Sequence, residues 1–309
     1  MTTSSPHVTI GVLTYRRPDD LAALLPTLVE QARRSPIPVE VVVVDNDPDA
    51  GAAGLVTDFD REVVRYVHEP TPGIAAARNR VLDEAASSDL LLFIDDDERP
   101  VPRWLELMIG TWEEHGAAAV VGPVISEFSE EPDPWILGGG FFTRRRLPTG
   151  SAVSVAATNN LLLDLREVRR LGLRFDPDFG LSGGSDTLFT RELAASGGRL
   201  VWCDDAIVYD VVPAARLTRN WVLQRYYRSG NSWSRTSVRL TGSRIDRLVT
   251  RIRLTVSGGI RVLGGTATWL WGAVARSTPK HAGGLRTLNR GMGMVSGAWG
   301  HVYSEYRRA

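Results

Sequence analysis

Four acidic residues stand side by side in the sequence: Asp95, Asp96, Asp97 and Glu98. They follow the uninterrupted apolar run Leu90–Ile94, which predicts a strand covered on both faces. Neighbouring carboxylates repel one another, and burying one without a partner is costly, so this cluster needs a cation. A divalent metal ion is the simplest candidate, and a solvated acidic turn is the alternative.

Further polar groups follow other predicted elements. The apolar stretch in VEVVVVDNDPD ends in Asp45 and Asp47, so carboxylates again mark the carboxyl end of a predicted strand, where they suit hydroxyl groups and a metal. Arg78 falls in the early turns of a predicted helix over residues 73–86, and a guanidinium there suits phosphate oxygens. In open α/β sheets the ligand crevice lies outside the carboxyl ends of the strands, so we expect the site there.

The elements that must position these groups alternate between strand and helix. Strands are predicted near residues 8–13, 39–45, 63–67, 90–94, 117–124, 156–164 and, as two short strands, 199–210; helices are predicted over 18–34, 73–86 and 103–115 and from Asp186. This alternation favours a parallel or mixed sheet with right-handed crossovers. The segment 130–150 is rich in Gly, Pro and charge and is predicted to be a long loop. The first strand is followed by no G-x-G-x-x-G and no G-x-x-x-x-G-K-[ST], which counts against a dinucleotide oxidoreductase and a P-loop enzyme.

Composition is that of a soluble globular protein, with 43% hydrophobic and 23% charged residues among 309. The single cysteine, Cys203, excludes an internal disulfide and favours a reducing compartment. Because it follows Trp202 in a strand-like run, we interpret it as a buried hydrophobe rather than a nucleophile. The N-terminus lacks a basic region followed by a long apolar run, so we expect no signal peptide.

The formal net charge is zero, but the acidic and basic residues are unevenly distributed along the chain. Residues 1–210 hold 34 acids against 19 Lys or Arg, whereas residues 211–304 hold 15 Lys or Arg against one acid, Asp246. We therefore predict two domains, 1–215 and 216–309, that face different partners.

The basic region from Leu217 onward is predicted to be helical, with a long segment over 245–274. Its longest uncharged run, Val262–Ala275, is too short to span a bilayer. A basic helix with Trp269 and Trp271 suits the headgroup region of an anionic membrane, and the alternative is a helical pair packed on the first domain. A nucleic-acid partner is disfavoured because the acidic first half would repel its phosphates.

Six segments, taken in order, resemble the inverting family-two glycosyltransferases with a GT-A fold. They are VTIGVLTYRRP, VVVVDNDP, PTPGIAAARN, LLFIDDDERP, ATNNLLL and FGLSGGSDTLF. The resemblance covers about residues 7–235, and the C-terminal part resembles a bacterial subgroup. It implies an α/β, Rossmann-like, mostly parallel central sheet flanked by helices, with a C-terminal helical extension.

The resemblance also implies a donor site. Tyr15 would stack on the nucleobase, Asp45 would accept hydrogen bonds from base or ribose, and Arg78 would reach the diphosphate. Asp97 would bind Mg²⁺ or Mn²⁺ directly, since hard oxygen ligands suit these ions. The full implied donor set is Thr14, Tyr15, Arg16, Asp45, Arg78, Asp95 and Asp96, with Asp95 also near the metal.

Asp186 falls where the family keeps its catalytic base. A sugar hydroxyl is too weak an acid to ionise at neutral pH, so a carboxylate must take its proton as it attacks. The alternative is a helix N-cap, although a cap alone does not require the Gly-Gly turn before it. The residues implied to contact acceptor or sugar are Asn159, Asn160, Gly184 and Ser185.

Two positions depart from the family pattern. Many relatives carry Glu immediately before the base, where this chain has Ser185, and that difference alters the charge near the acceptor. Relatives often carry His at the position of Asp210. A carboxylate there is either a further metal ligand or a structural residue.

We therefore predict a metal-dependent, inverting transfer of sugar from a nucleotide-diphosphate donor, with UDP favoured, to a hydroxyl of a glycan, a lipid-linked saccharide or a natural product. Two alternatives remain. One is a non-catalytic sugar-nucleotide binder or membrane scaffold. The other is a nucleotidyltransferase. Such enzymes usually have a glycine-rich loop with lysine after the first strand, and the segment TYRRPDD at that place disfavours this class. The expected location is cytoplasmic, peripheral on the inner face of the cell membrane.

Overall fold

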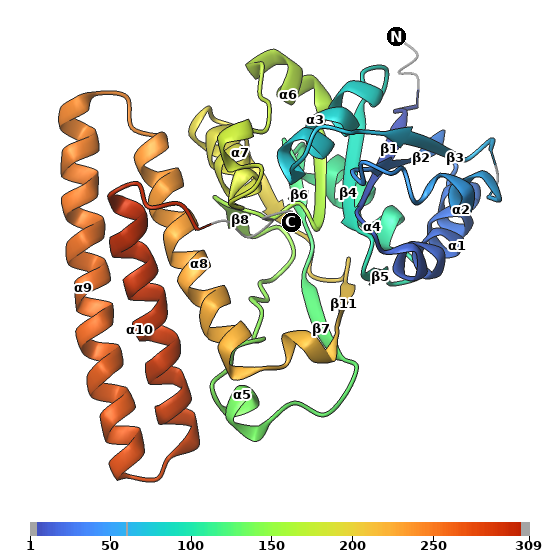
Figure 1. Ribbon diagram of the computed structural model, residues 1–309. Helices are drawn as coiled ribbons and strands as arrows, with labels where there is room; N and C mark the ends of the chain where they lie inside the picture. Colours follow the sequence, from blue (N-terminus) through green and yellow to red (C-terminus); the bar gives the residue numbers. More distant parts are fainter. Residues whose placement is uncertain (1–4, 60, 304–309) are drawn as a thin grey trace. The chain divides into compact units, whose positions relative to one another are not determined.

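The computed structural model describes residues 5–59 and 61–303, and the chain divides into two compact units (Figure 1). Unit 1 consists of the chain up to residue 125 together with 144–181 and 185–211, and unit 2 of 126–143, 182–184 and the chain from 212 onward. The predicted domains instead divided the chain once, after residue 215. The outer ends of those domains, 1–4 and 304–309, lie outside the described residues.

Unit 1 is built on a sheet whose eight strands lie in the order β3-β2-β1-β4-β9-β6-β10-β8. Their bounds are β1 (Val8–Thr14), β2 (Val39–Asp45), β3 (Val64–His68), β4 (Leu90–Asp95), β6 (Ala119–Val121), β8 (Ala152–Val153), β9 (Asn160–Asp164) and β10 (Leu200–Trp202). The strands from β3 to β4 are parallel, β9 runs antiparallel to both β4 and β6, and β10 is parallel to β6. The predicted α/β class is confirmed, with a sheet that is parallel in its first half and mixed beyond it.

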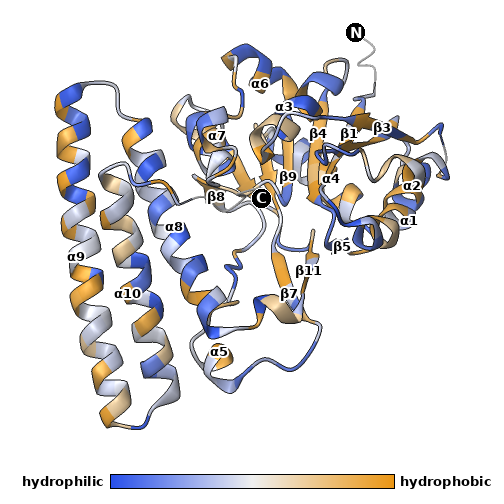
Figure 2. Ribbon diagram, in the orientation of Figure 1, coloured by the Kyte–Doolittle hydropathy of each residue, from blue (hydrophilic) through white to orange (hydrophobic). Residues whose placement is uncertain are grey.

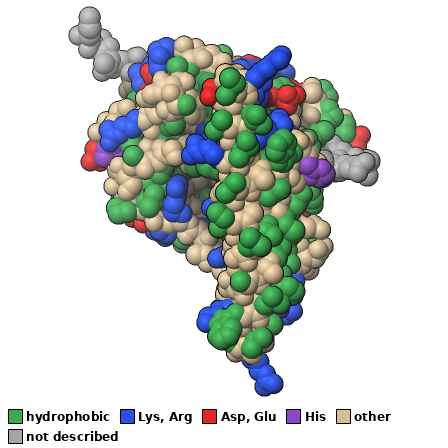
Figure 3. Space-filling view, turned by 90° about the vertical axis from the view of Figure 1, so that its left-hand side faces the viewer, with side chains coloured by type: hydrophobic (Ala, Val, Ile, Leu, Met, Phe, Trp, Pro, Cys, Tyr) green, Lys and Arg blue, Asp and Glu red, His purple; other side chains and the backbone are tan. Residues whose placement is uncertain are grey.

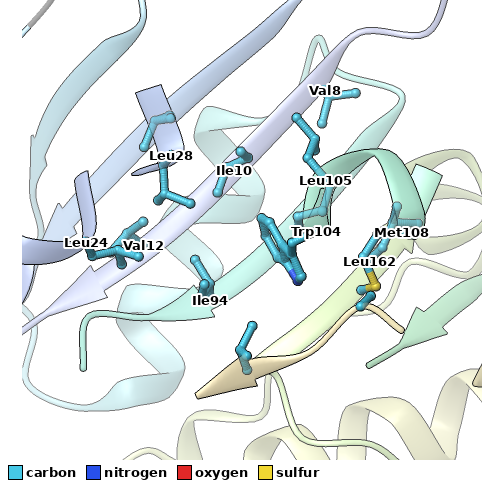
Figure 4. Close-up of a cluster of buried hydrophobic side chains, with 14 of the residues drawn as sticks. Val8, Ile10, Val12, Leu24, Leu28, Ile94, Trp104, Leu105, Met108 and Leu162 are labelled. Carbon is cyan, nitrogen blue, oxygen red and sulfur yellow. The ribbon is translucent and has the colours of Figure 1, made fainter. Parts of the chain in front are cut away.

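Helices cover both faces of this sheet (Figure 1). They are α1 (Pro18–Arg34), α2 (Ala53–Thr57), α3 (Ile74–Glu84), α4 (Trp104–His115), α6 (Leu165–Leu171) and α7 (Ser185–Ala195), with a 3₁₀ turn η1 (Pro177–Phe179). One core cluster joins alternate residues of β1 and β4 to α1 and α4, as Figure 4 shows for Ile10, Leu24 and Trp104. The opposite residues of the strands pack against α3, α6 and α7. The strands are thus buried on both faces, at about 1.5–3 kcal/mol for each large apolar side chain.

One glycine sets the distance between sheet and helix. A Cβ on Gly11 of β1 would overlap Val81 of α3, so only glycine lets this helix approach β1 closely. The approach matters because α3 carries Arg78 toward the end of the sheet where β1 and β4 finish.

A smaller sheet has the order β5-β11-β7, with bounds β5 (Glu98–Pro100), β7 (Val124–Phe128) and β11 (Val208–Val212). Antiparallel pairing of β5 with β11 sets Asp210 opposite Glu98. The single strand predicted over 117–124 is wrong, since Gly122 and Pro123 separate β6 from β7. Proline lacks the N–H that a continuing ladder requires, and a Cβ on Gly122 would overlap Asn160.

Unit 2 consists mainly of helices: α5 (Pro134–Gly138), a 3₁₀ turn η2 (Ala214–Arg216), α8 (Arg219–Arg239), α9 (Arg244–Val274) and α10 (Thr278–Ala298). The predicted loop over 130–150 therefore includes a short helix, α5, whose Trp135 packs in one cluster with Val222 of α8 and Ala282 of α10. Strands β1 and β4 of unit 1 are strongly hydrophobic, whereas α8 is largely hydrophilic (Figure 2).

Candidate functional site

The carboxyl ends of β1, β2 and β4 meet at one edge of the sheet. The parallel register places Thr14 opposite Asp45 and Leu13 opposite Asp95. The chain proceeds from β1 to β2 and β3 on one side, while β4 lies on the other side of β1. The order of strands thus changes direction between β1 and β4, which is where α/β sheets bind their ligands.

The acidic cluster after β4 is held by a cation from the chain itself. One nitrogen of Arg17 donates to Asp96 at 3.0 Å and to Asp97 at 2.7 Å. The Thr14 hydroxyl donates to the other Asp96 oxygen at 2.8 Å. Asp96 and Asp97 are buried, so the alternative of a solvated acidic turn is wrong. The need for a countercharge is met here by a guanidinium.

These carboxyl groups are electrostatically strained. Burial, with the Asp97 carboxylate adding to it, raises the pKa of Asp95 to about 7, and burial raises the pKa of Asp96 to about 6. Burial also raises the pKa of Glu98 well above its usual range, helped by Asp95 beside it. Each shift means that more positive charge at this edge would be favourable.

The donor set fits a hard divalent cation. Asp96 and Asp97 direct carboxylate oxygens at one cationic centre, now the Arg17 guanidinium, and such oxygens suit Mg²⁺ and Mn²⁺. Across residues 5–59 and 61–303, no group of three or more His, Cys, Asp or Glu side chains is arranged to hold a metal. For a metal ion to bind at these two carboxylates, a phosphate-bearing ligand would have to supply further oxygens.

Arg78 connects this edge to α7. It lies in α3, is buried, and donates to the Ser185 hydroxyl at 2.7 Å. Another of its nitrogens lies 3.8 Å from the Asp186 carboxylate. Asp186 lies inside the first turn of α7 and its side chain accepts from the N–H of Thr187, so it is not an N-cap. The structure thus brings together the residue predicted to reach the diphosphate and the predicted base.

The chain before α7 bends through two glycines. Gly183 and Gly184 have φ of 74° and 95°, values that favour glycine strongly. Ser185 was predicted to contact the acceptor. It is fully buried, and its hydroxyl accepts a hydrogen bond from Arg78. We therefore assign Ser185 to positioning Arg78.

The loop after β2 is organised by its acidic residues. Asp45 is fully buried, and its carboxylate accepts from the N–H groups of Asp47 and Ala52 and from the Tyr66 hydroxyl. Asn46 donates to the carbonyls of Glu69 and Thr71, and so fixes the segment that leads into α3. Asp45 anchors this loop, and its contact with base or ribose stays a prediction.

The turn after β1 holds the residues predicted to meet the nucleobase. Arg16 has φ of 54°, a left-handed conformation that costs a non-glycine residue about 1–2 kcal/mol. Its side chain bonds Asp47 at 3.1 Å and lies over the Tyr15 ring, 5.3 Å from its centre. The role of Tyr15 and Arg16 at the nucleobase stays a prediction.

The two asparagines at the start of β9 differ. Asn159 donates to Glu98 at 2.8 Å, beside the acidic cluster. Asn160 is buried, accepts from Trp104, and donates to the carbonyls of Pro123 and Ala206. Because its amide is already in use within the core, we propose no acceptor contact for Asn160.

Asp210, for which the sequence left a metal-ligand role and a structural role open, has a cationic partner. Arg144 donates to it at 2.8 Å. Together the two groups carry no net charge, as a neutral histidine would, so the substitution adds no uncompensated negative charge beside Glu98. This pairing favours the structural alternative for Asp210.

Sequence reasoning missed the groups that hold the site in place: Arg17, Asn46, Glu98 as a hydrogen-bond acceptor, Arg144, and the positioning role of Ser185. Arg17, Asn46 and Glu98 had a usable signal, since each lies among the polar residues that directly follow β1, β2 or β4.

The chain is similar to known proteins in sequence and in fold. Residues 9–163 match the family described as Glycosyl transferase family 2. The chain is 35% identical over 232 residues to the succinoglycan biosynthesis protein ExoM of Rhizobium meliloti (strain 1021), covering 74% of each chain. Among solved structures it is similar to S. aureus TarS 1–349 in complex with UDP-GlcNAc, with a TM-score of 0.53, 15% identity and 89% of each chain covered. It is also similar to GalNAc-T7 with UDP, GalNAc and Mn²⁺, with a TM-score of 0.54, 13% identity, and 74% of this chain and 51% of the other covered. At these low identities, the similarity to TarS and to GalNAc-T7 shows a shared fold and nothing further.

Proposed function

Because this chain belongs to glycosyl transferase family 2, as its family match and its ExoM relative show, we propose that the acidic edge of its sheet binds a nucleoside diphosphate sugar. The chain is a glycosyltransferase with a GT-A fold that uses a nucleotide-sugar donor. The identity of the nucleotide, the metal ion and the stereochemistry of transfer are our proposals.

For the donor we propose a UDP-sugar bound with Mg²⁺ or Mn²⁺. Tyr15 offers a ring face to the base, and Arg78 a guanidinium to the diphosphate. Asp97, with Asp95 and Asp96 beside it, would hold the divalent ion, which when bound supplies positive charge to the departing diphosphate. Support comes from the raised pKa of Asp95 and Asp96, and from TarS and GalNAc-T7, whose structures hold UDP-GlcNAc and UDP.

For the chemical step we propose that Asp186 is the general base. It takes the proton of the acceptor hydroxyl, whose oxygen forms a bond to the anomeric carbon. The bond from that carbon to the diphosphate oxygen breaks, and its electron pair leaves with the nucleoside diphosphate. A single displacement of this kind inverts the anomeric configuration. Arg78 lies beside Asp186 and steadies the leaving group's charge.

The acceptor we propose is a hydroxyl of a glycan or a lipid-linked saccharide. The name of the ExoM relative, a succinoglycan biosynthesis protein, favours these over a natural product.

The observation that carries the proposal is the Arg78 side chain, which reaches Ser185 and Asp186 from the edge where the acids gather. A non-catalytic binder would have no need of a carboxylate held beside this guanidinium. A nucleotidyltransferase stays disfavoured because the segment after β1 is not a glycine-rich loop with lysine.

A panel of nucleotide sugars with Mn²⁺ tests the proposal. We expect one donor to raise the melting temperature, because a ligand that binds the folded state stabilises it, and to release its nucleoside diphosphate slowly. Asp97→Ala should lose the Mn²⁺-dependent release, while Asp49→Ala, an exposed acid of the β2 loop, should retain it. Release that is equal in both variants would exclude Asp97 as a metal ligand, and no response to any donor would contradict donor binding.

A further inference from the structure

The long helix α9 turns most of its large apolar side chains away from the rest of unit 2. They recur every three or four residues, which places them on one face of the helix. Ile245, Leu263 and Val274 are 76%, 74% and 78% exposed, and the face also includes Leu248, Val249, Ile252, Val256, Ile260 and Leu270. Figure 3, which views the side where α9 lies in Figure 1, shows a column of hydrophobic side chains along this helix. The face is about 45 Å long, at 1.5 Å per residue.

The opposite, buried face of α9 consists of Leu254 followed by three glycines. Gly258, Gly265 and Gly272 recur every seven residues and are buried against α10. A Cβ on Gly265 would overlap the backbone at Leu288, and one on Gly272 would overlap the backbone at His281. From Gly258 onward the two helices therefore pack through small residues at close range, and the large aliphatic groups named above lie outside, whereas Leu254 is buried. This reverses the usual arrangement of a helix in water and matches helices packed within lipid.

Positive charge surrounds the exposed apolar face. Residues 244–303 contain nine Lys or Arg and a single acid, Asp246. Arg244, Arg253, Arg261 and Arg276 are exposed on α9 or just beyond it. An exposed apolar strip bordered by arginines is complementary to a surface with anionic headgroups above acyl chains.

Two tryptophans lie at this surface. Trp271 is 59% exposed near the end of α9. Trp299 is also exposed and donates to Thr255 of α9 at 3.0 Å. Trp269, which the sequence also suggested for lipid contact, instead donates to His281 at 2.8 Å. Trp271 and Trp299 are the ones placed for a membrane interface, where amphipathic rings are favoured.

The helix is not suited to cross a bilayer. Within the described part of the chain, no helix is both long and apolar enough for that. A second copy of the chain is a poorer occupant than lipid, because pairing two such faces would bring arginines against arginines.

We propose that α9 lies in the plane of an anionic lipid bilayer, with the face from Ile245 to Val274 in the acyl boundary and its arginines on the headgroups. The proposal uses none of the residues assigned to sugar transfer and does not depend on their roles.

Co-sedimentation of the full-length protein with lipid vesicles tests the proposal. We expect binding to phosphatidylcholine vesicles that contain phosphatidylglycerol, weaker binding to phosphatidylcholine alone, and a loss of binding as salt rises. Quenching of tryptophan fluorescence by brominated lipids should fall in Trp271→Phe. Absence of binding to the anionic vesicles at low salt would overturn the proposal.

Substitutions on the face separate its apolar and electrostatic parts. Ile252→Gln combined with Val256→Gln and Ile260→Gln should weaken vesicle binding about tenfold or more, since each change removes apolar surface and retains a good helix former. The matched control is Leu137→Gln on α5, whose side chain is 51% exposed against 50% for Ile252; it should bind as the parent does.

Two results would contradict lipid binding by this face. The first is a triple variant that binds vesicles as tightly as the parent while both keep the same melting temperature. The second is a parent that is dimeric by light scattering, binds no vesicles, and becomes monomeric in the triple variant. That outcome would assign the face to a second copy of the chain.

Discussion

The Arg78 guanidinium lies 3.8 Å from the Asp186 carboxylate, although the two residues belong to different helices, α3 and α7. Ser185 accepts a hydrogen bond from the same guanidinium and fixes its direction. One cation thus stands beside both the proposed base and the expected position of the diphosphate. In an inverting displacement those two groups act on opposite sides of the same carbon, so their relative placement decides whether the chemistry is feasible.

Arg17→Ala should destabilise the protein by about 1–3 kcal/mol, because it leaves the carboxylates of Asp96 and Asp97 without their cation. Unfolding by urea in EDTA measures the loss. Mn²⁺ should restore more stability to this variant than to the parent, since the ion would replace the missing charge. Arg16→Ala, which breaks more exposed ion pairs, should cost less than about 1 kcal/mol. Equal effects of Mn²⁺ on parent and Arg17→Ala would show that the ion does not bind at these acids.

Tyr66, which donates a hydrogen bond to Asp45 at the end of β2, should make the free energy of unfolding depend on pH. Burial and the Asp45 carboxylate raise the pKa of Tyr66 from 10.0 to about 12. Between these values the folded state binds more protons than the unfolded state, so stability falls as pH rises through this window and is fully present below it. The difference in unfolding free energy between the parent and Tyr66→Phe should be about 1 kcal/mol near pH 9 and shrink toward pH 11. A difference that does not change with pH would mean that Tyr66 loses its proton equally easily in both states.

The C-terminal helices should be sensitive to single methyl groups. In α10, a Cβ on Gly293 would overlap the Tyr227 carbonyl of α8, whereas a Cβ on Gly283 would meet no other atom within 4 Å. Gly293→Ala should therefore destabilise unit 2 by about 1–3 kcal/mol. Gly283→Ala should be neutral or stabilising by up to about 1 kcal/mol, because alanine is the better helix former. Calorimetry of both variants checks this, and equal melting curves would contradict the close packing of α8 and α10.

Much of unit 1 was predictable because its signals are local. The apolar runs that became β1, β2 and β4 and the acids at their ends follow from neighbouring residues alone, and Asp186 was rightly placed near a helix start. In parallel strands those ends must share an edge of the sheet, so the location of the site was predictable as well.

What could not be predicted depends on residues distant in the sequence. The position of Asn160 at the start of a strand is one that a site residue would also occupy. Only its hydrogen bonds with Trp104 and Ala206 show that its amide is structural. Arg144 pairs with Asp210 across the fold, which no periodicity indicates. The apolar residues of α9 predicted a helix correctly, but which face they occupy depends on the glycines of α10 against which the helix packs.

The most direct test of sugar transfer at this site compares Asp186→Asn with the parent, using the nucleotide sugar that stabilises the parent. We predict that the variant keeps the donor-induced rise in melting temperature but releases nucleoside diphosphate about 10²–10⁴-fold more slowly, because only the proton acceptor has been removed. Release at the parental rate would contradict the assignment of Asp186 as the base. Loss of both donor binding and turnover would show instead that the carboxylate beside Arg78 serves to build the site.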